Sequence, residues 1–173
     1  PQSPEGYTLS DAFVEIEVDS DTAYQIDHVS GDVVIEAEYE NDSVRGELVL
    51  GKRGSVLTDY NGDFVYEDID LEGTEFDIYA GENIYTPDFQ KGEDGNRLLL
   101  YAEGTLVATV STNAYGKAMV SDLPLGRYQV VETKAPEGFV LQKAPVMVDL
   151  LYDGPYTPVV KKEIAIKNDR QKV

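Results

Sequence analysis

Short stretches of alternating apolar and polar residues, rich in Val, Ile, Tyr and Thr, follow one another along the chain. Alternation with a period of two is typical of β-strands, and the Gly, Asn, Asp and Pro residues between the stretches mark turns. No segment keeps a helical period over three turns. The predicted strands are 12–18, 32–40, 46–50, 75–80, 105–110, 117–120, 127–132, 145–151 and 162–168. The pattern therefore predicts an all-β chain that folds as an antiparallel β-sandwich.

The beginning of the chain repeats its end. Two pairs of segments match, 3–18 with 135–150 and 33–42 with 162–169. The first pair shares Pro-Glu-Gly-aromatic and an alternating strand, and the second pair ends in Asn-Asp, at Asn41 and Asn168. Self-similarity of this kind indicates tandem repeats. We expect residues 1–43 to be the C-terminal strands of a preceding repeat and residues 44–173 to be a complete domain, both within an internal segment of a longer protein.

The charge of the chain excludes some classes of partner. Acidic residues number 33 against 14 basic ones, which gives a formal net charge of -19. This charge repels nucleic acid and anionic lipid, so we predict no nucleic-acid binding. No apolar run approaches the roughly 20 residues that span a bilayer, so we predict no membrane insertion. The first ten residues also lack the basic and apolar regions of a signal peptide.

The sequence offers little for metal or enzyme chemistry. It has no cysteine and a single histidine, so disulfides, thiolate metal sites and Ser/His/Asp or Cys/His arrangements are excluded, and we predict no cofactor and no metal. Asp59, Asn61 and Asp63 resemble the start of a calcium loop, but no glutamate stands at its twelfth position. We interpret Asn61-Gly62 as a hairpin turn. A peptidase or glycosidase is disfavoured. A glycosidase needs two facing carboxylates in a cleft, whereas most acids here alternate onto the outward face of the predicted strands.

Three predicted strands each end a core-facing apolar row with one polar residue. Residues two apart share a face of a strand. The rows are Leu48, Leu50 and Lys52; Tyr128, Val130 and Glu132; and Ile164, Ile166 and Asn168. Burying these polar groups costs several kcal/mol unless they satisfy one another.

The three polar residues have complementary chemistry. Desolvation lowers the pKa of a lysine and raises that of a carboxyl group, so a buried Lys52 amine can become a neutral nucleophile. A protonated Glu132 could donate to the oxyanion that develops on Asn168 and carry protons to the departing ammonia. The product would be a Lys52–Asn168 isopeptide bond with Glu132 as the catalyst. The alternative is that all three are solvated strand-end residues, and periodicity alone leaves both interpretations open.

The run LPLGRYQVVETKAPEGF at 123–139 resembles the signature of the Cna B-type, or SpaA-like, domains of Gram-positive adhesins and pilins. Four other segments resemble the opening strand, the second conserved block, the hairpin and the closing strand of that family, at 46–52, 73–80, 108–126 and 163–169. The resemblance covers about residues 44–173 and implies an Ig-like or prealbumin-like antiparallel β-sandwich. Arg53-Gly54 departs from the family, in which an acidic residue often follows the lysine.

The resemblance also implies the site. In that family the opening-strand lysine bonds to the closing-strand asparagine with help from the acid of the Tyr-x-Val-x-Glu strand, and these positions match Lys52, Asn168 and Glu132. Asn41 resembles the acceptor asparagine of the upstream repeat. We predict that Asn41 is unbonded, because its lysine and glutamate partners would precede Pro1.

The function that the resemblance implies is mechanical. It indicates a non-enzymatic, monomeric stalk module of an extracellular surface protein, anchored to the cell wall in its full-length parent, whose partners are neighbouring repeats of the same polypeptide. The alternative is an adhesin domain that binds a host matrix protein or glycan through the insertion at 81–104, where Tyr85 and Phe89 are expected to be exposed. The insertion is also consistent with a loop that packs on its own sandwich.

Overall fold

The computed structural model describes residues 2–13, 15, 17, 40–87 and 91–170. Within these residues the secondary structure is entirely β, with no helix that could cross a membrane, and the prediction of an all-β chain is confirmed. The strands are β1 (Arg45–Tyr60), β2 (Phe64–Asp70), β3 (Glu75–Ala80), β4 (Ile84–Tyr85), β5 (Leu99–Tyr101), β6 (Leu106–Ser111), β7 (Lys117–Leu123), β8 (Gly126–Lys134), β9 (Val146–Leu150) and β10 (Val159–Asn168). The strands predicted at 12–18 and 32–40 lie largely outside the described residues.

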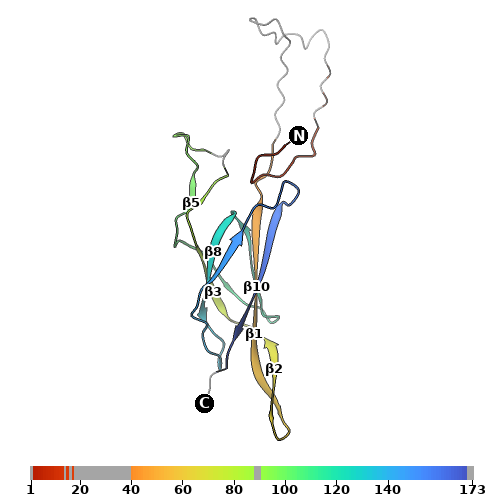
Figure 1. The fold of residues 1–173 in the computed structure, drawn as a ribbon, viewed down its shortest axis with the longest axis vertical. Coiled ribbons are helices and arrows are strands. Elements are labelled where there is room, and N and C mark those ends of the chain that lie inside the picture. The colour runs from red at the N-terminus through yellow and green to blue at the C-terminus, as the bar shows by residue number, and fades with distance from the viewer. Residues whose placement is uncertain (1, 14, 16, 18–39, 88–90, 171–173) are drawn as a thin grey trace, which may run out of the picture.

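Two four-stranded sheets pack face to face (Figure 1). In the first sheet β1 pairs with β10, with β7 and, further along its length, with β2. The second sheet has the order β6-β3-β8-β9. Side chains from both sheets meet in one buried cluster: Leu48, Leu50, Phe76, Ile78, Ala80, Ile84, Ala118, Leu123, Tyr128, Val130, Val148, Leu150 and Ile166. The period-two apolar rows of the sequence therefore form the inner faces of a sandwich.

The pairing of the first and last strands of the sandwich is parallel, whereas the other strand pairs are antiparallel. β1 and β10 stay in register from Arg45 opposite Val159 to Gly54 opposite Asn168. Figure 1 shows the consequence, since β1 begins at the end of the molecule where the N-terminal residues lie and β10 finishes near the C-terminus at the other end. The chain thus enters and leaves the sandwich at opposite ends.

β1 is much longer than its predicted core segment at 46–50. It continues past Lys52 to Tyr60 and turns back through residues 61–63 into β2, so the predicted Asn61-Gly62 hairpin is confirmed. β8 likewise continues beyond the predicted end at Glu132 to Lys134, whereas β10 ends at Asn168 as the predicted strand 162–168 does. The outer half of β1 was missed because it pairs with β2 outside the core and has no inward apolar row to reveal it.

The insertion between β3 and β6 is partly a two-stranded ribbon of β4 and β5. Ile84 is buried in the core of the sandwich, whereas Tyr85 next to it is 38% exposed, as expected. Phe89 lies outside the described residues. The base of the insertion therefore packs on its own sandwich, while its outer side chains face solvent.

The two Pro-Glu-Gly-aromatic segments have the same local geometry. Tyr7 N donates to Pro4 O, and Phe139 N donates to Pro136 O, at 3.1 and 3.2 Å. The aromatic residue then forms an antiparallel bridge just after the repeated Asn-Asp, Tyr7 with Ser43 and Phe139 with Arg170. The glycines share a left-handed φ, 88° and 86°. The two segments therefore share one local turn geometry, in which Asn41 and Asn168 each stand two residues before the residue that is bridged to the aromatic.

Candidate cross-linking site

Lys52, Glu132 and Asn168 meet in the interior between the two sheets. Lys52 and Asn168 come from the parallel neighbours β1 and β10, and Glu132 comes from β8 of the facing sheet. Lys52 Nζ lies 2.6 Å from Glu132 Oε2 and 2.5 Å from Asn168 Oδ1. Asn168 Nδ2 donates to Glu132 Oε1 at 2.6 Å. Each of the three side chains thus contacts the other two.

The site is closed to solvent. Lys52, Glu132 and Asn168 are 0%, 4% and 1% exposed. The Phe76 ring, which stands opposite Glu132 on the neighbouring strand β3, lies with its centroid 5.6 Å from Lys52 Nζ. A charged amine in such a place has lost its hydration and has only this small set of polar partners.

Burial lowers the pKa of Lys52 from its ordinary value of 10.5, while the hydrogen bond and the charge of Glu132 act in the opposite direction. Desolvation is the larger effect, because the amine is removed from water whereas a single carboxylate compensates it. The neutral, nucleophilic form of the amine is therefore more accessible here than on the surface.

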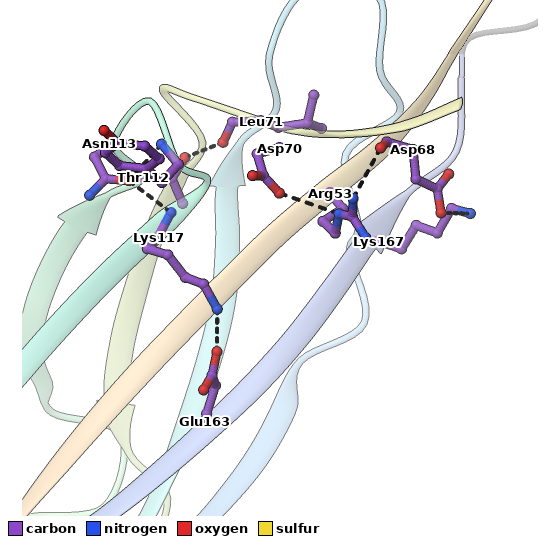
Figure 2. A network of polar contacts seen from close by, with 10 residues as sticks. Arg53, Asp68, Asp70, Leu71, Thr112, Asn113, Lys117, Glu163 and Lys167 are labelled. Carbon is purple, nitrogen blue, oxygen red and sulfur yellow. Dashed lines mark hydrogen bonds and ion pairs between the residues drawn. The ribbon is translucent and has the colours of Figure 1, made fainter. Parts of the chain in front are cut away.

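The backbone around Lys52 is fixed on both sides. Lys52 N donates to Gly116 O at 2.7 Å, and Leu71 N donates to Lys52 O at 3.0 Å. Thr112 Oγ1 in turn donates to Leu71 O at 2.6 Å (Figure 2). The turns after β2 and β6 therefore hold this point of β1. The direction of the Lys52 side chain toward Asn168 is set by β1 together with these two turns.

Ion pairs join the same strands on the outer face of the sheet (Figure 2). Arg53 pairs with Asp70 at 3.3 Å, and Lys167 pairs with Asp68 at 2.8 Å. These two basic residues each adjoin a site residue in sequence and point away from it, as the alternation of a strand requires. Exposed pairs of this kind contribute about 0–1 kcal/mol each. Their effect here is to keep β1, β2 and β10 in register beside the site.

Two neighbours of the site were not foreseen from the sequence. Phe76 belongs to the predicted strand 75–80, and its inward phase was the available signal. Thr112 is buried at 3% exposed and lies in a turn segment, where a short polar residue gave no signal of burial. Arg53-Gly54 does not form a local turn after the lysine, because β1 passes straight through it.

The remaining predicted positions lie elsewhere. Asn41 is near the N-terminal turn, where its Oδ1 accepts a hydrogen bond from Ser10 N at 3.1 Å. Asp59, Asn61 and Asp63 are in the exposed β1–β2 hairpin. Over the part of the chain that the structure describes, no cluster of three or more His, Asp or Glu side chains could hold a metal ion.

The family model of the SpaA prealbumin-like fold domain matches residues 65–164, more than half of the chain. The chain belongs to this family. Its prealbumin-like fold is therefore shown, and SpaA-type domains are structural rather than catalytic, so this member is not an enzyme. The matched range contains Glu132 but stops short of Lys52 and Asn168, so the case for a cross-link depends on the geometry above.

Solved structures resemble this SpaA-type chain along most of its length. The Bacillus anthracis TIE protein has 24% identity and a TM-score of 0.55, over 98% of this chain and 24% of its own. The minor pilin GBS52 of Streptococcus agalactiae has 20% identity and a TM-score of 0.46, over 77% of this chain and 48% of its own. The major pilin SpaD of Corynebacterium diphtheriae has 25% identity and a TM-score of 0.45, over 73% of this chain and 30% of its own. The chain thus spans half or less of each of these three proteins, and no curated protein matches it.

Proposed function

We propose that residues 44–173 form a structural repeat of an extracellular surface protein, locked by an isopeptide bond that joins Lys52 to Asn168 with Glu132 as the catalyst. The observation that carries the proposal is the closed contact of one amine, one carboxyl and one carboxamide in an interior without solvent. A buried, unlinked lysine would be a costly way to stabilise a core, because buried ion pairs often stabilise less than apolar packing.

The arrangement supports a balanced reaction. Glu132 Oε2 takes a proton from Lys52 Nζ, and the neutral amine attacks Cγ of Asn168. The Nζ–Cγ bond forms, Glu132 Oε1 passes the proton it took to Nδ2, and the Cγ–Nδ2 bond breaks with release of ammonia. The second proton of Nζ then moves to Glu132 Oε2, so that the products are a neutral amide, ammonia and a protonated Glu132. The amide oxygen of Asn168 accepts a hydrogen bond from Lys52 Nζ. The two oxygens of Glu132 therefore suit a proton relay between the attacking and leaving nitrogens.

The bond would stiffen the fold by joining its first and last strands. Its two residues are 116 positions apart in the chain. By analogy with a disulfide that closes a loop of this length, it would lower the entropy of the unfolded chain by an equivalent of about 4–5 kcal/mol. This is a large share of the 5–15 kcal/mol that stabilises a typical domain. Without cysteine in the sequence, the bond would serve as a staple that needs no oxidant.

We also propose that residues 1–43 are the end of a preceding repeat, so that the parent protein is a tandem array. The matching turns at Tyr7 and Phe139 support this arrangement, as does the correspondence of Asn41 with Asn168. In such an array Asn41 would bond to a lysine of its own repeat. In this chain we predict that Asn41 stays unbonded.

Intact mass spectrometry tests the bond. The wild-type protein should be lighter than its sequence by the mass of one ammonia, and Lys52→Ala, Asn168→Ala and Glu132→Ala should each have the full mass of their sequence. Fragmentation should place the cross-link between the peptides that contain Lys52 and Asn168.

The matched control is Lys167→Ala. Lys167 adjoins Asn168 and also forms an ion pair, but its side chain is 55% exposed on the outer face. This variant should still lose one ammonia. A wild-type protein at full mass would refute the cross-link, and loss of ammonia in the Glu132→Ala variant would refute the catalytic role of that residue.

The adhesin alternative has one observation in its favour. Leu98, Leu99 and Leu100 of the insertion are 49%, 51% and 42% exposed in succession. Exposed apolar side chains that lie together mark interaction surfaces. Screening the purified chain against matrix proteins and glycans tests this alternative, because a purely structural repeat should bind none of them.

A further inference from the structure

The outer half of β1 and the whole of β2 form a hairpin that leaves the sandwich (Figure 1). β1 pairs with β10 as far as Gly54 and continues for six further residues to Tyr60, a projection of roughly 20 Å at about 3.3 Å per residue. Leu57 stands opposite Tyr66, and Tyr60 stands opposite Phe64. Opposed residues share a face of the ribbon, as do residues two apart, so these four large side chains lie on one face.

This apolar face has no packing partner within the described part of the chain. Leu57, Tyr60, Phe64 and Tyr66 are 40%, 65%, 65% and 52% exposed, and the rings of Tyr60 and Phe64 lie tilted against each other with their centroids 5.2 Å apart. A two-stranded ribbon alone is marginally stable in water, and a row of exposed large apolar side chains marks a docking surface. The hairpin therefore has the properties of an element that is completed by a partner.

Distances along the chain identify the partner. The matching turns make Asn41 the counterpart of Asn168, and β1 of the present domain begins four residues after Asn41, at Arg45. Four residues span at most about 14 Å. The hairpin projects roughly 20 Å beyond Gly54, which pairs with Asn168, and points toward the end where the chain leaves (Figure 1). In a tandem array it must therefore lie alongside the next repeat.

We propose that the apolar face of the β1–β2 hairpin packs onto the N-terminal end of the following repeat and makes the joint between the two repeats rigid. This inference rests on the proposed tandem array. The docking site is a groove of about 350 Å³ at that end of the sandwich. Apolar and aromatic side chains from several segments line it, including Tyr85, Pro87, Leu100, Leu125 and Tyr152.

The position of the Pro-Glu-Gly turn places the hairpin beside this groove. The Phe139 ring covers Gly54 at the base of the hairpin so closely that a Cβ there would lie 2.3 Å from it. Tyr7 is the counterpart of Phe139 in the preceding repeat, and the two residues before it, Glu5 and Gly6, line the groove. The hairpin of the preceding repeat would thus start next to the groove.

The charges of the two surfaces are complementary. The tip of the hairpin carries Asp59 and Asp63, both exposed. The groove is lined by two arginines, Arg45 and Arg97, and one acid, Glu5, and Arg45 also forms an ion pair with Asp122 at 3.5 Å. The arginines at this end of the sandwich would attract the acidic tip of the hairpin. This attraction favours end-to-end docking of two repeats over a sideways association of two acidic domains.

A tandem protein tests the proposal, with residues 1–170 followed by a second copy of residues 44–173. The chain contains no tryptophan, so a single Phe64→Trp substitution provides a specific fluorescent probe of the hairpin. In the first copy the probe should emit at shorter wavelength and be protected from quenching by acrylamide. In the last copy, which has no following repeat, the same probe should emit as it does in the single chain. Equal emission from the two positions would overturn the proposal.

Groove variants in the second copy complete the test. Leu100→Asp should abolish the shift of the first-copy probe, whereas Met119→Asp, at a residue 58% exposed on β7 outside the groove, should leave the shift intact. A blue shift of the single chain that grows with its concentration would instead show association between molecules and would overturn the proposal. Intact mass of the same samples reports the cross-links separately. A tandem protein that has lost two ammonia molecules, one for each copy, but whose first-copy probe stays exposed would refute the rigid joint and leave the cross-link standing.

Discussion

At the scale of single residues, Lys52 is in an environment that departs far from the usual one of a lysine. It is fully buried, yet its amine has a carboxylate and a carboxamide within hydrogen-bonding distance. Burial lowers its pKa and the contact with Glu132 raises it, with burial the larger effect. Lysine, unlike arginine, can lose its proton when it is desolvated, so the chemistry requires a lysine at this position.

The shifted pKa predicts how pH affects an unlinked protein. Asn168→Ala keeps Lys52 but cannot form the bond, and a double variant with Lys52→Met removes the titrating amine. Because folding lowers the pKa of Lys52 below 10.5, the unfolded chain binds this proton more tightly. Burying the charged Lys52 amine therefore lowers the free energy of unfolding by its full amount below the pKa of Lys52 in the folded protein. This loss disappears as the pH rises toward 10.5, the ordinary pKa of lysine.

Urea unfolding of the two variants between pH 7 and pH 10 measures the effect. The free energy of unfolding of Asn168→Ala should rise with pH relative to that of the double variant. The double variant is the control for every other group that titrates in this range. A relative stability that falls with rising pH would mean that the charge of Glu132 outweighs burial.

At the scale of elements, the sequence predicted best where one face of a strand is buried. The strand at 75–80 was predicted to the residue, and the predictions at 105–110 and 127–132 differ from β6 and β8 by one or two residues at their ends. These strands have inward apolar rows, which periodicity detects. β2 and the outer half of β1 have no core face, and β4 and β5 are too short to show a period.

The candidate site could be predicted because its residues continue those inward rows. Lys52, Glu132 and Asn168 stand in phase with buried apolar residues, so their common orientation followed from alternation alone. The parallel pairing of β1 with β10 could not be predicted in this way, since it depends on contacts between residues more than 100 positions apart. The hold on Lys52 by the turns at Leu71 and Gly116 was likewise invisible in the local pattern.

The turn between β6 and β7 provides a test of this hold. Gly116 has a φ of 64°, and a Cβ there would lie 2.4 Å from Lys52 O. Gly73 has a similar φ of 75° but nothing within 4 Å of the position of a Cβ. Alanine in the left-handed region costs about 1–2 kcal/mol. Gly73→Ala should therefore cost about this amount, and Gly116→Ala should cost more because it also displaces the backbone of Lys52.

Two measurements separate the contributions to this effect. Urea unfolding in an Asn168→Ala background gives the stability of each variant without the cross-link. Intact mass in the otherwise wild-type protein gives the fraction that forms the bond, which should fall for Gly116→Ala and remain complete for Gly73→Ala. Equal behaviour of the two variants would show that the contact with Lys52 O has no role in holding the site.

At the scale of the whole molecule, the parallel β1–β10 pair decides how a pulling force passes through the domain. Tension on the two ends loads β1 and β10 in shear, because the chain enters at the start of β1 and leaves at the end of β10 (Figure 1). A bond from Lys52 to Asn168 would carry this load directly. The force would then run along β1 from Arg45 to Lys52, cross the bond and leave at Asn168, so that residues 53–167 would bear none of it.

Single-molecule stretching from the two ends of the chain tests this path. The bonded domain should show no unfolding event that releases residues 53–167. Lys52→Ala should unfold and lengthen by up to about 400 Å, since the 116 positions between the two site residues extend by about 3.3–3.6 Å each. Lys167→Ala, which leaves the buried site intact, should stretch like the wild type. The contradicting outcome is a wild-type sample that has lost one ammonia and still lengthens as much as Lys52→Ala. Such a result would refute the force path through the Lys52–Asn168 bond.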